Sequence, residues 1–228
     1  DGQGIEVRDK VRSLGGTAEF IKCDVSKQED IKRSVESALE VFGKIDVLFN
    51  NAGVAGPGNF PNETFEDWSY ILDVNLNGVF NMCSEVWPHM VSTGGGSIVN
   101  MSSGAATFGF SDYIKNASGR VPPAAYTVAK AGVDALTRYM AGVGGKHNIR
   151  VNCIRPVQIM TPGATRGTID DADGGHHVFE DMFNMAQIIP GPGYPTDVAN
   201  LVLFLACEDS RFITSEIINI DGGVAAKI

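Results

Sequence analysis

The stretch Tyr126-Thr127-Val128-Ala129-Lys130 decides both the fold and the chemistry that this sequence predicts. If the stretch is helical, Tyr126 and Lys130 lie four residues apart and share one face of the helix. A lysine ammonium beside a phenol favours the phenolate, and so lowers the pKa of the phenol from its reference value of about 10. The pair therefore predicts a general acid/base that works near neutral pH.

Two polar residues upstream complete the candidate catalytic set. Ser103 follows the apolar run 97–101, which is typical of a buried strand, so its hydroxyl is delivered to the carboxyl end of that strand. A hydroxyl in that place would hydrogen-bond a substrate carbonyl while Tyr126 exchanges its proton. Asn75 lies near the start of a predicted helix, where a buried amide must find hydrogen-bond partners.

Length and composition indicate one globular domain over residues 1–228. Hydrophobic residues make up 43% and charged residues 20% of the chain, which is unlike a disordered protein. The net charge of −9, with scattered basic residues, argues against a nucleic-acid partner or an anionic membrane. No apolar run approaches the ~20 residues of a membrane span, and the sequence begins without signal-peptide features. The cysteines are far apart, as expected of reduced thiols, so we expect a cytoplasmic protein.

Strand and helix patterns alternate along the chain. Strands are expected at 18–25, 45–49, 97–102, 149–154 and 217–220, and helices at 5–14, 27–42, 74–90, 124–143 and from 196 onward. Ser26, Thr64 and Thr196 are the predicted helix caps, and Pro88 should bend or loosen the end of its helix. Together these elements predict an α/β fold with a doubly wound parallel sheet and helices on both faces.

Taken together, the motifs resemble the short-chain dehydrogenase/reductase family over nearly the whole chain. Those that carry the resemblance are Cys23-Asp24-Val25, Asn50-Asn51-Ala52-Gly53, Asp73-Val74-Asn75, Ser103, Tyr126 to Lys130 and Ile220-Asp221-Gly222-Gly223. The resemblance implies a Rossmann-like oxidoreductase that uses NAD or NADP. It also implies a homotetramer or homodimer, built from the two long helices and the C-terminal segment.

The resemblance also implies a role for each matching residue. Tyr126 would be the general acid/base, with Lys130 lowering its pKa and holding the nicotinamide ribose. Ser103 would orient the carbonyl, and Asn75 would hold a water that links the lysine to solvent. The implied cofactor contacts are Asp24 and Val25 at the adenine, Asn51, Ala52 and Gly53 along the ribose, and Ile159 and Thr161 at the nicotinamide carboxamide.

Three stretches depart from the family or stand apart from its motifs. The 23 residues from Ser103 to Tyr126 exceed the usual interval, so Phe110–Pro122 reads as an insertion beside the substrate, and Ser111 is nearer the usual spacing. We prefer Ser103, because the strand before it delivers it to the sheet edge. Val157 stands where the family usually has glycine, and a β-branched residue tolerates positive φ poorly. Residues 162–190 read as a lid with an apolar inner face, and the adjacent histidines at 176 and 177 have no metal-site spacing.

The glycine-rich turn that usually opens a dinucleotide-binding fold is not found in this sequence. Gly2-Gln3-Gly4 follows no strand, and lacks a third glycine. By resemblance, Asp1 falls just after the second strand of the family, so a first strand–helix–strand of about 30 to 40 residues is expected to be missing. The residue that selects NAD or NADP would belong to that segment.

These observations predict an oxidoreductase that moves a hydride between NAD(P) and a secondary alcohol or ketone, with Tyr126, Lys130, Ser103 and Asn75 in the site and no metal. The expected partner is a small alcohol or ketone with apolar surface. One alternative is an inactive dehydrogenase-like binding or scaffold protein. Another is a sugar-nucleotide epimerase or dehydratase, although only 98 residues follow Lys130 for a substrate region.

Overall fold

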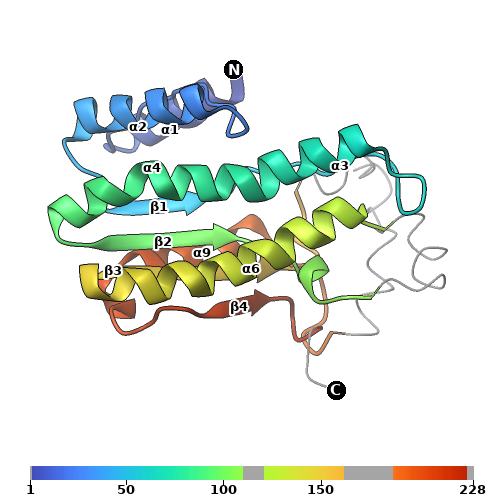
Figure 1. The fold of residues 1–228 in the computed structure, drawn as a ribbon. Helices are drawn as coiled ribbons and strands as arrows, with labels where there is room; N and C mark the ends of the chain where they lie inside the picture. Colours follow the sequence, from blue (N-terminus) through green and yellow to red (C-terminus); the bar gives the residue numbers. More distant parts are fainter. Residues whose placement is uncertain (1, 110–120, 162–186, 225–228) are drawn as a thin grey trace.

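The computed structural model of the protein describes residues 2–109, 121–161 and 187–224 (Figure 1). Its centre is a four-stranded sheet in the order β1-β2-β3-β4, and every neighbouring pair is parallel. The strands are β1 (Val47–Asn50), β2 (Gly96–Met101), β3 (Ile149–Pro156) and β4 (Ile217–Ile220). Because all four run the same way, their carboxyl ends meet at one edge of the sheet, where open α/β sheets bind ligands.

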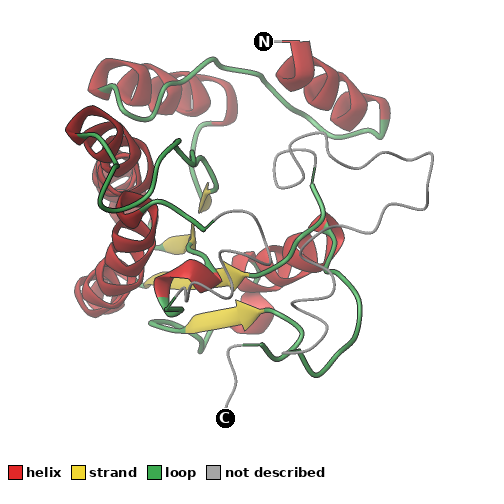
Figure 2. Cartoon of the chain, turned by 90° about the vertical axis from the view of Figure 1, so that its right-hand side faces the viewer, coloured by secondary structure: helices red, strands yellow, loops and turns green. Residues whose placement is uncertain are grey.

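Helices cover both faces of the sheet, which confirms the predicted single-domain Rossmann-like architecture (Figures 1 and 2). On one face lie α4 (Gly78–Thr93) and α6 (Ala124–Gly144), with α2 (Gln28–Phe42) beside α4. On the other face lies α9 (Pro195–Ala206). In β1, Leu48 packs into the first core and Phe49 into the second, so an apolar run without alternation serves a strand that is covered on both sides.

The strand expected at 18–25 is absent, and that prediction is wrong. The segment follows α1 (Gly2–Ser13), a helix with no buried residue. Isolated hydrogen bonds hold it in place, such as the one that Arg12 Nε donates to the main-chain oxygen of Ala18 at 2.9 Å. A strand needs a neighbour with which to exchange main-chain hydrogen bonds. None of the described strands lies beside this segment, so it carries no ladder.

The helix expected from 74 to 90 begins and ends later than predicted. Thr64 caps α3 (Phe65–Leu72) as predicted, since its side chain accepts from the main-chain nitrogen of Asp67 at 3.1 Å. A π-helical turn, η1 (Asp73–Asn77), then joins α3 to α4. Helix α4 continues past Pro88 to Thr93, so the proline lies inside the helix and does not end it.

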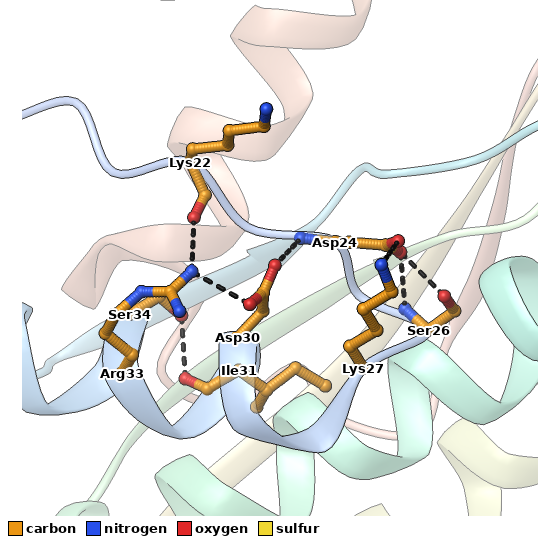
Figure 3. A network of polar contacts seen from close by, with 8 residues as sticks. All are labelled: Lys22, Asp24, Ser26, Lys27, Asp30, Ile31, Arg33 and Ser34. Atoms are coloured by element: carbon orange, nitrogen blue, oxygen red, sulfur yellow. Dashed lines mark hydrogen bonds and ion pairs between the residues drawn. The ribbon is translucent and has the colours of Figure 1, made fainter.

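Two predicted helix caps are also wrong. Helix α2 begins at Gln28 after Lys27, while Ser26 instead donates its hydroxyl to Asp24 (Figure 3). Helix α9 begins at Pro195, one residue before the predicted cap Thr196. Proline suits the first helical position because its missing N–H is not needed there, and this moves the cap back to Tyr194. In the described part of the chain, no helix is long and apolar enough to cross a membrane.

Candidate active site

A pocket of about 470 Å³ opens at the carboxyl edge of the sheet. Its walls come from the ends of β1, β2 and β3, from the first turn of α6 and from the start of α9. Five of the residues singled out from the sequence line it together: Asn51, Ser103, Tyr126, Ile159 and Thr161. Residues far apart in the chain thus meet in one cavity, as expected for the end of a parallel sheet.

Helix α6 holds Tyr126 in the pocket and Lys130 behind it. Lys130 is only 3% exposed, and its Nζ donates to the main-chain oxygen of Met101 at 2.9 Å. The same nitrogen lies 5.6 Å from the centre of the Tyr126 ring. The spacing of four residues therefore places the two side chains on one face, as predicted. The ammonium, however, is hydrogen-bonded to the main chain of β2 and lies over the ring of the tyrosine.

The expected lowering of the pKa of Tyr126 by Lys130 is not found in this structure. Burial raises the pKa of Tyr126, and hydrogen bonding with Ser103 lowers it only in part. Burial also lowers the pKa of Lys130 from 10.5 to about 8. Both shifts have one physical cause, because a site poor in water disfavours the phenolate and the ammonium alike.

Ser103 stands two residues beyond β2 with an extended backbone. Its Oγ accepts a hydrogen bond from the main-chain nitrogen of Ala105 at 3.2 Å, which starts the short helix η2 (Gly104–Ala106). This contact fixes the hydroxyl oxygen, and the hydroxyl is also hydrogen-bonded with Tyr126, so the two polar groups line the pocket as a pair. The alternative Ser111 and residues 110–120 of the insertion lie outside the described residues.

Asn75 lies on the π-turn η1 and is completely buried. Its Nδ2 donates to the main-chain oxygens of Val54 and Ile71 at 2.8 and 2.9 Å, and its Oδ1 accepts from the nitrogen of Val54 at 3.3 Å. The side chain therefore fixes the loop that follows β1. A Cβ at Gly53 would lie 2.8 Å from Oδ1 of Asn75 and 3.6 Å from Nζ of Lys130, so only glycine fits there. Gly53, Asn75 and Lys130 thus lie together, while Ala52 is exposed.

Asp24 and Val25 do not line the pocket. Asp24 belongs to a polar network before α2, where its carboxylate accepts from the nitrogen of Ser26 at 3.1 Å and from its Oγ at 2.7 Å (Figure 3). The pKa of Asp24 is lowered mainly by these two hydrogen bonds. Val25 packs against the start of α4, since a Cβ at Gly78 would lie 2.9 Å from its side chain.

The departure at Val157 is accommodated by its neighbours. Val157 does not have a positive φ; the following residue, Gln158, does, at φ 50°. Room for the valine comes from Gly104, where a Cβ would lie 2.2 Å from the Val157 side chain. The left-handed residue of this segment is thus Gln158, one position after Val157.

Comparison with known proteins agrees with this geometry. A family model described as enoyl-(acyl carrier protein) reductase matches residues 3–225. A cyclohexanol dehydrogenase from Acinetobacter sp. (strain SE19) is 35% identical over 225 residues, which are 97% of this chain and 80% of that protein. The chain belongs to the short-chain dehydrogenase/reductase family.

Two solved structures of dehydrogenases share the fold. A 7α-hydroxysteroid dehydrogenase complexed with NADH and 7-oxo glycochenodeoxycholic acid has a TM-score of 0.84 at 30% identity, covering 96% of this chain and 79% of that one. A gluconate 5-dehydrogenase from Burkholderia cenocepacia J2315, in complex with NADP and tartrate, has a TM-score of 0.84 at 26% identity, covering 98% and 81%. This short-chain dehydrogenase/reductase is therefore an NAD(P)-dependent enzyme that acts on CH–OH or C=O groups.

The pocket of this short-chain dehydrogenase/reductase fits the nicotinamide half of such a cofactor. Asn51, Ser103 and Thr161 supply polar groups, and Phe49 and Ile159 supply apolar walls. At Gly53, the side chain of Asn75 already occupies the place that a Cβ would take, so the main chain there carries no side chain. Small residues at this point let a ligand approach the main chain closely.

Two contacts around the site were missed by the sequence reasoning. The carboxylate of Glu63 accepts from the main-chain nitrogens of Ala124 and Ala125 at 3.0 and 3.2 Å, at the start of α6. Asp134, four residues beyond Lys130 on α6, forms a buried ion pair with Arg155 at the end of β3. The spacing of four places Asp134 on the same face of α6 as Lys130, but no pattern in the sequence indicates Arg155 as its partner.

No metal site is found in the part of the chain that the structure describes, where no group of three or more His, Cys, Asp or Glu side chains comes together. The two adjacent histidines and residues 162–186 of the lid predicted over 162–190 lie outside the described residues.

Proposed function

We propose that this enzyme interconverts a secondary alcohol and a ketone with apolar surface, using Tyr126 as general acid/base. The observation that carries the proposal is that Tyr126 and Ser103 line the same pocket, at the sheet edge where ligands bind. The names of similar proteins support the substrate class: cyclohexanol dehydrogenase acts on an alicyclic alcohol, and (+)-borneol dehydrogenase 2 of Salvia officinalis, 34% identical, on another.

The proton chemistry follows from the burial of Tyr126. Because burial raises the pKa of Tyr126, its hydroxyl is protonated at neutral pH and can donate its proton to the oxygen of a ketone. In the reverse direction Tyr126 must first pass its own proton on towards solvent, and the resulting phenolate then receives the alcohol proton. The Ser103 hydroxyl, fixed by Ala105, donates to the same oxygen and stabilises the negative charge that develops on it.

Lys130 and Asn75 support this proton transfer from behind. With a pKa of about 8, the Lys130 ammonium can release and regain a proton close to neutral pH. Asn75 holds the loop that carries Gly53 against the ammonium, which keeps this space small. We assign to the two residues the passage of the proton between Tyr126 and solvent.

The cofactor would lie along the carboxyl edge of the sheet. Nicotinamide supplies the hydride when it is bound. Its carboxamide would be held by Ile159 and Thr161. Its ribose would be held by Lys130 and by the segment Asn51 to Gly53. Asp24 and Val25, which lie away from the pocket, are proposed to flank the adenine. Binding measurements decide between NAD and NADP, since one solved relative is a complex with NADH and another is a complex with NADP.

We propose that two copies of the chain pair through α4 and α6. A groove of about 340 Å³ runs between these helices, lined mainly by apolar side chains that include Phe80, Trp87 and Tyr139. Phe80 is 53% and Tyr139 73% exposed, although both are large and apolar. A second copy offers the same two helices, so a twofold contact would bury both patches at once. A dimer, or a tetramer of two dimers, follows.

Two further proposals concern the whole protein. The cysteines among the described residues are all free, which supports a reducing cytoplasmic compartment. Among the described strands, β1 has a neighbour on one side only, and an apolar groove lined by Ala38, Phe42 and Met82 lies between α2 and β1. We propose that this edge and groove are a place where further secondary structure packs.

Titration with NADH and with NADPH, followed by nicotinamide fluorescence, tests the proposal first. Saturable binding of one dinucleotide, together with oxidation of cyclohexanol or a larger alicyclic alcohol, is expected. A cooperatively folded protein that binds neither would instead support a scaffold role. Turnover of a sugar nucleotide without net change in the dinucleotide would support an epimerase.

A further inference from the structure

Gln158 lines the active-site pocket in an unusual state. Its side-chain nitrogen and oxygen are both buried, and neither has a hydrogen-bond partner among the described residues. In that part of the chain, these are the only buried side-chain polar atoms left without a partner. Nearly all buried polar groups in proteins are hydrogen-bonded, so an unsatisfied amide calls for an explanation.

The main chain holds Gln158 firmly in this position. Its backbone is left-handed, with φ 50°, a conformation that costs free energy for any residue with a side chain. Its carbonyl oxygen accepts from the nitrogen of Gly193 at 3.1 Å, and the nitrogen of Met160 donates to the oxygen of Gly193 at 2.9 Å. Contacts on both sides therefore keep a strained residue against the pocket.

An apolar side chain would suit this position better if its role were only to fill space. Burying an unpaired amide is unfavourable, whereas a methionine of similar length would lose nothing when buried. The same pocket contains Ser103 and Tyr126, the two groups that would contact the reacting oxygen. Strain and an unsatisfied polar group that coincide in such a pocket point to ligand binding.

We propose that Gln158 is a ligand-recognition residue, whose amide pairs with a ligand group that both accepts and donates a hydrogen bond beside the reacting carbon. The inference rests on the proposed function and deepens it. Two ligands can present this chemistry: the primary carboxamide of a nicotinamide, or a hydroxyl on the carbon next to the one oxidised in the substrate. In the second case the enzyme prefers vicinal diols and hydroxyketones over simple alcohols.

Gln158→Met is the informative variant, because methionine keeps the length and the unbranched Cβ, and therefore the backbone strain, while removing both polar atoms. Gln28→Met, on the exposed first turn of α2, is the matched control. Without ligand, Gln158→Met should raise the melting temperature by about 2–4 °C, since an unsatisfied amide is removed. A fall in melting temperature would mean that the amide has a partner, and would overturn the inference.

Two ligand experiments then distinguish the sources. For the cofactor, dissociation constants are measured for the preferred dinucleotide and for its 3-acetylpyridine analogue, in which a methyl replaces the amide nitrogen. For the substrate, kcat/KM is measured for trans-cyclohexane-1,2-diol and for cyclohexanol. Gln158→Met should reduce the preference for the amide dinucleotide, or the preference for the diol, by about 10-fold.

The outcomes separate this inference from the proposed function. If wild type binds a dinucleotide and both preferences are the same in Gln158→Met, only the role of Gln158 is overturned. If wild type binds neither NADH nor NADPH, the proposed function fails, and the role of Gln158 fails with it. Gln28→Met should match wild type throughout.

Discussion

The carboxylate of Glu63 accepts a hydrogen bond at 3.0 Å from the main-chain nitrogen of Ala124, a residue 61 positions further along the chain. Ala124 is the first residue of α6, and the first N–H groups of a helix have no partner within it. A carboxylate there also interacts favourably with the helix dipole. Tyr126 follows two residues later, so the loop before α3 fixes the start of the helix that carries the general acid/base.

Replacing Glu63 by alanine should therefore affect both stability and catalysis. We expect the free energy of unfolding to fall by about 1 kcal/mol, as when a helix cap is removed. Because Tyr126 loses its fixed position, kcat should fall more than KM rises. Urea unfolding and steady-state kinetics measure the two effects. Glu36→Ala, at an exposed position in α2, is the control; equal effects in both variants would rule out a positioning role.

Removing the phenolic hydroxyl should stop proton transfer without disturbing the fold. Tyr126→Phe is expected to reduce kcat/KM by at least about 10²-fold, the lower range for general acid–base catalysis. Circular dichroism and thermal unfolding should match wild type, because the ring and its packing remain. Near-normal turnover would refute the assignment of Tyr126.

Lys130 should make stability depend on pH in a defined direction. Its pKa is about 8 when folded and 10.5 ordinarily, so between these values the unfolded chain binds more protons, and the free energy of unfolding rises with pH. Lys130→Met lacks this contribution. From pH 7.5 to 9.5, the stability of wild type relative to Lys130→Met should therefore rise by up to about 2 kcal/mol.

Other groups titrate in the same range, which is why the difference between the two proteins is measured. Burial raises the pKa of Cys83 and of Cys153 to about 12, so these thiols lower stability as pH rises. Both proteins contain these thiols, so the contribution of Cys83 cancels in the difference; both should also carry Cys153→Ala, because Cys153 interacts electrostatically with Lys130. Urea unfolding curves that keep the same separation at every pH would contradict the shifted pKa of Lys130.

The buried pair of Asp134 and Arg155 should show strong coupling. Asp134→Asn leaves the guanidinium of Arg155, whose side chain is only 14% exposed, without a carboxylate, and should cost about 3 kcal/mol of stability. Combining Asp134→Leu with Arg155→Met removes both charges and should recover most of that loss. A double-mutant cycle by urea unfolding measures the coupling; single effects that simply add would show that the pair is not an energetic unit.

The proposed contact between copies is tested by placing a charge in the groove between α4 and α6. Tyr139→Glu should yield a smaller species at the same protein concentration, because a carboxylate would be buried against apolar side chains. Light scattering coupled to gel filtration reports the mass. Tyr70→Glu, at a 53% exposed position on α3, should leave the mass unchanged. If both variants keep the wild-type mass, the groove is not the interface.

The elements predicted most accurately from the sequence are those whose pattern is local. The strand at 217–220 has the predicted bounds, and α6 begins at Ala124 as expected. The prediction of a strand at 18–25 was wrong, because a strand forms only where an adjacent strand offers main-chain hydrogen bonds. A local sequence pattern does not show whether such a neighbour is present. The π-turn was missed for a related reason, since an amphipathic pattern does not distinguish it from an α-helical turn.

In the site, the residue types were predictable but their electrostatics were not. The motifs correctly brought Ser103 and Tyr126 to one pocket. The pKa of Tyr126 moves opposite to expectation, because burial raises it more than the hydrogen bond with Ser103 lowers it, while Lys130 lies 5.6 Å from the centre of the ring. Gln158 and Glu63 went unnoticed since neither carries a pattern of its own; only the folded chain shows which backbone amides a distant carboxylate meets.

The π-turn Asp73–Asn77 also has a consequence for how this family tolerates length changes. One extra residue in a helix shifts everything after it by about 100° around the axis. Asn75 lies on this turn and is completely buried, and α4 begins directly after the turn with a buried face of its own. Deleting a single residue there would restore a continuous α-helix and rotate either Asn75 or the core face of α4 away from its partners. The site is thus encoded in part by a residue count, which substitution scanning would never reveal and a deletion scan would.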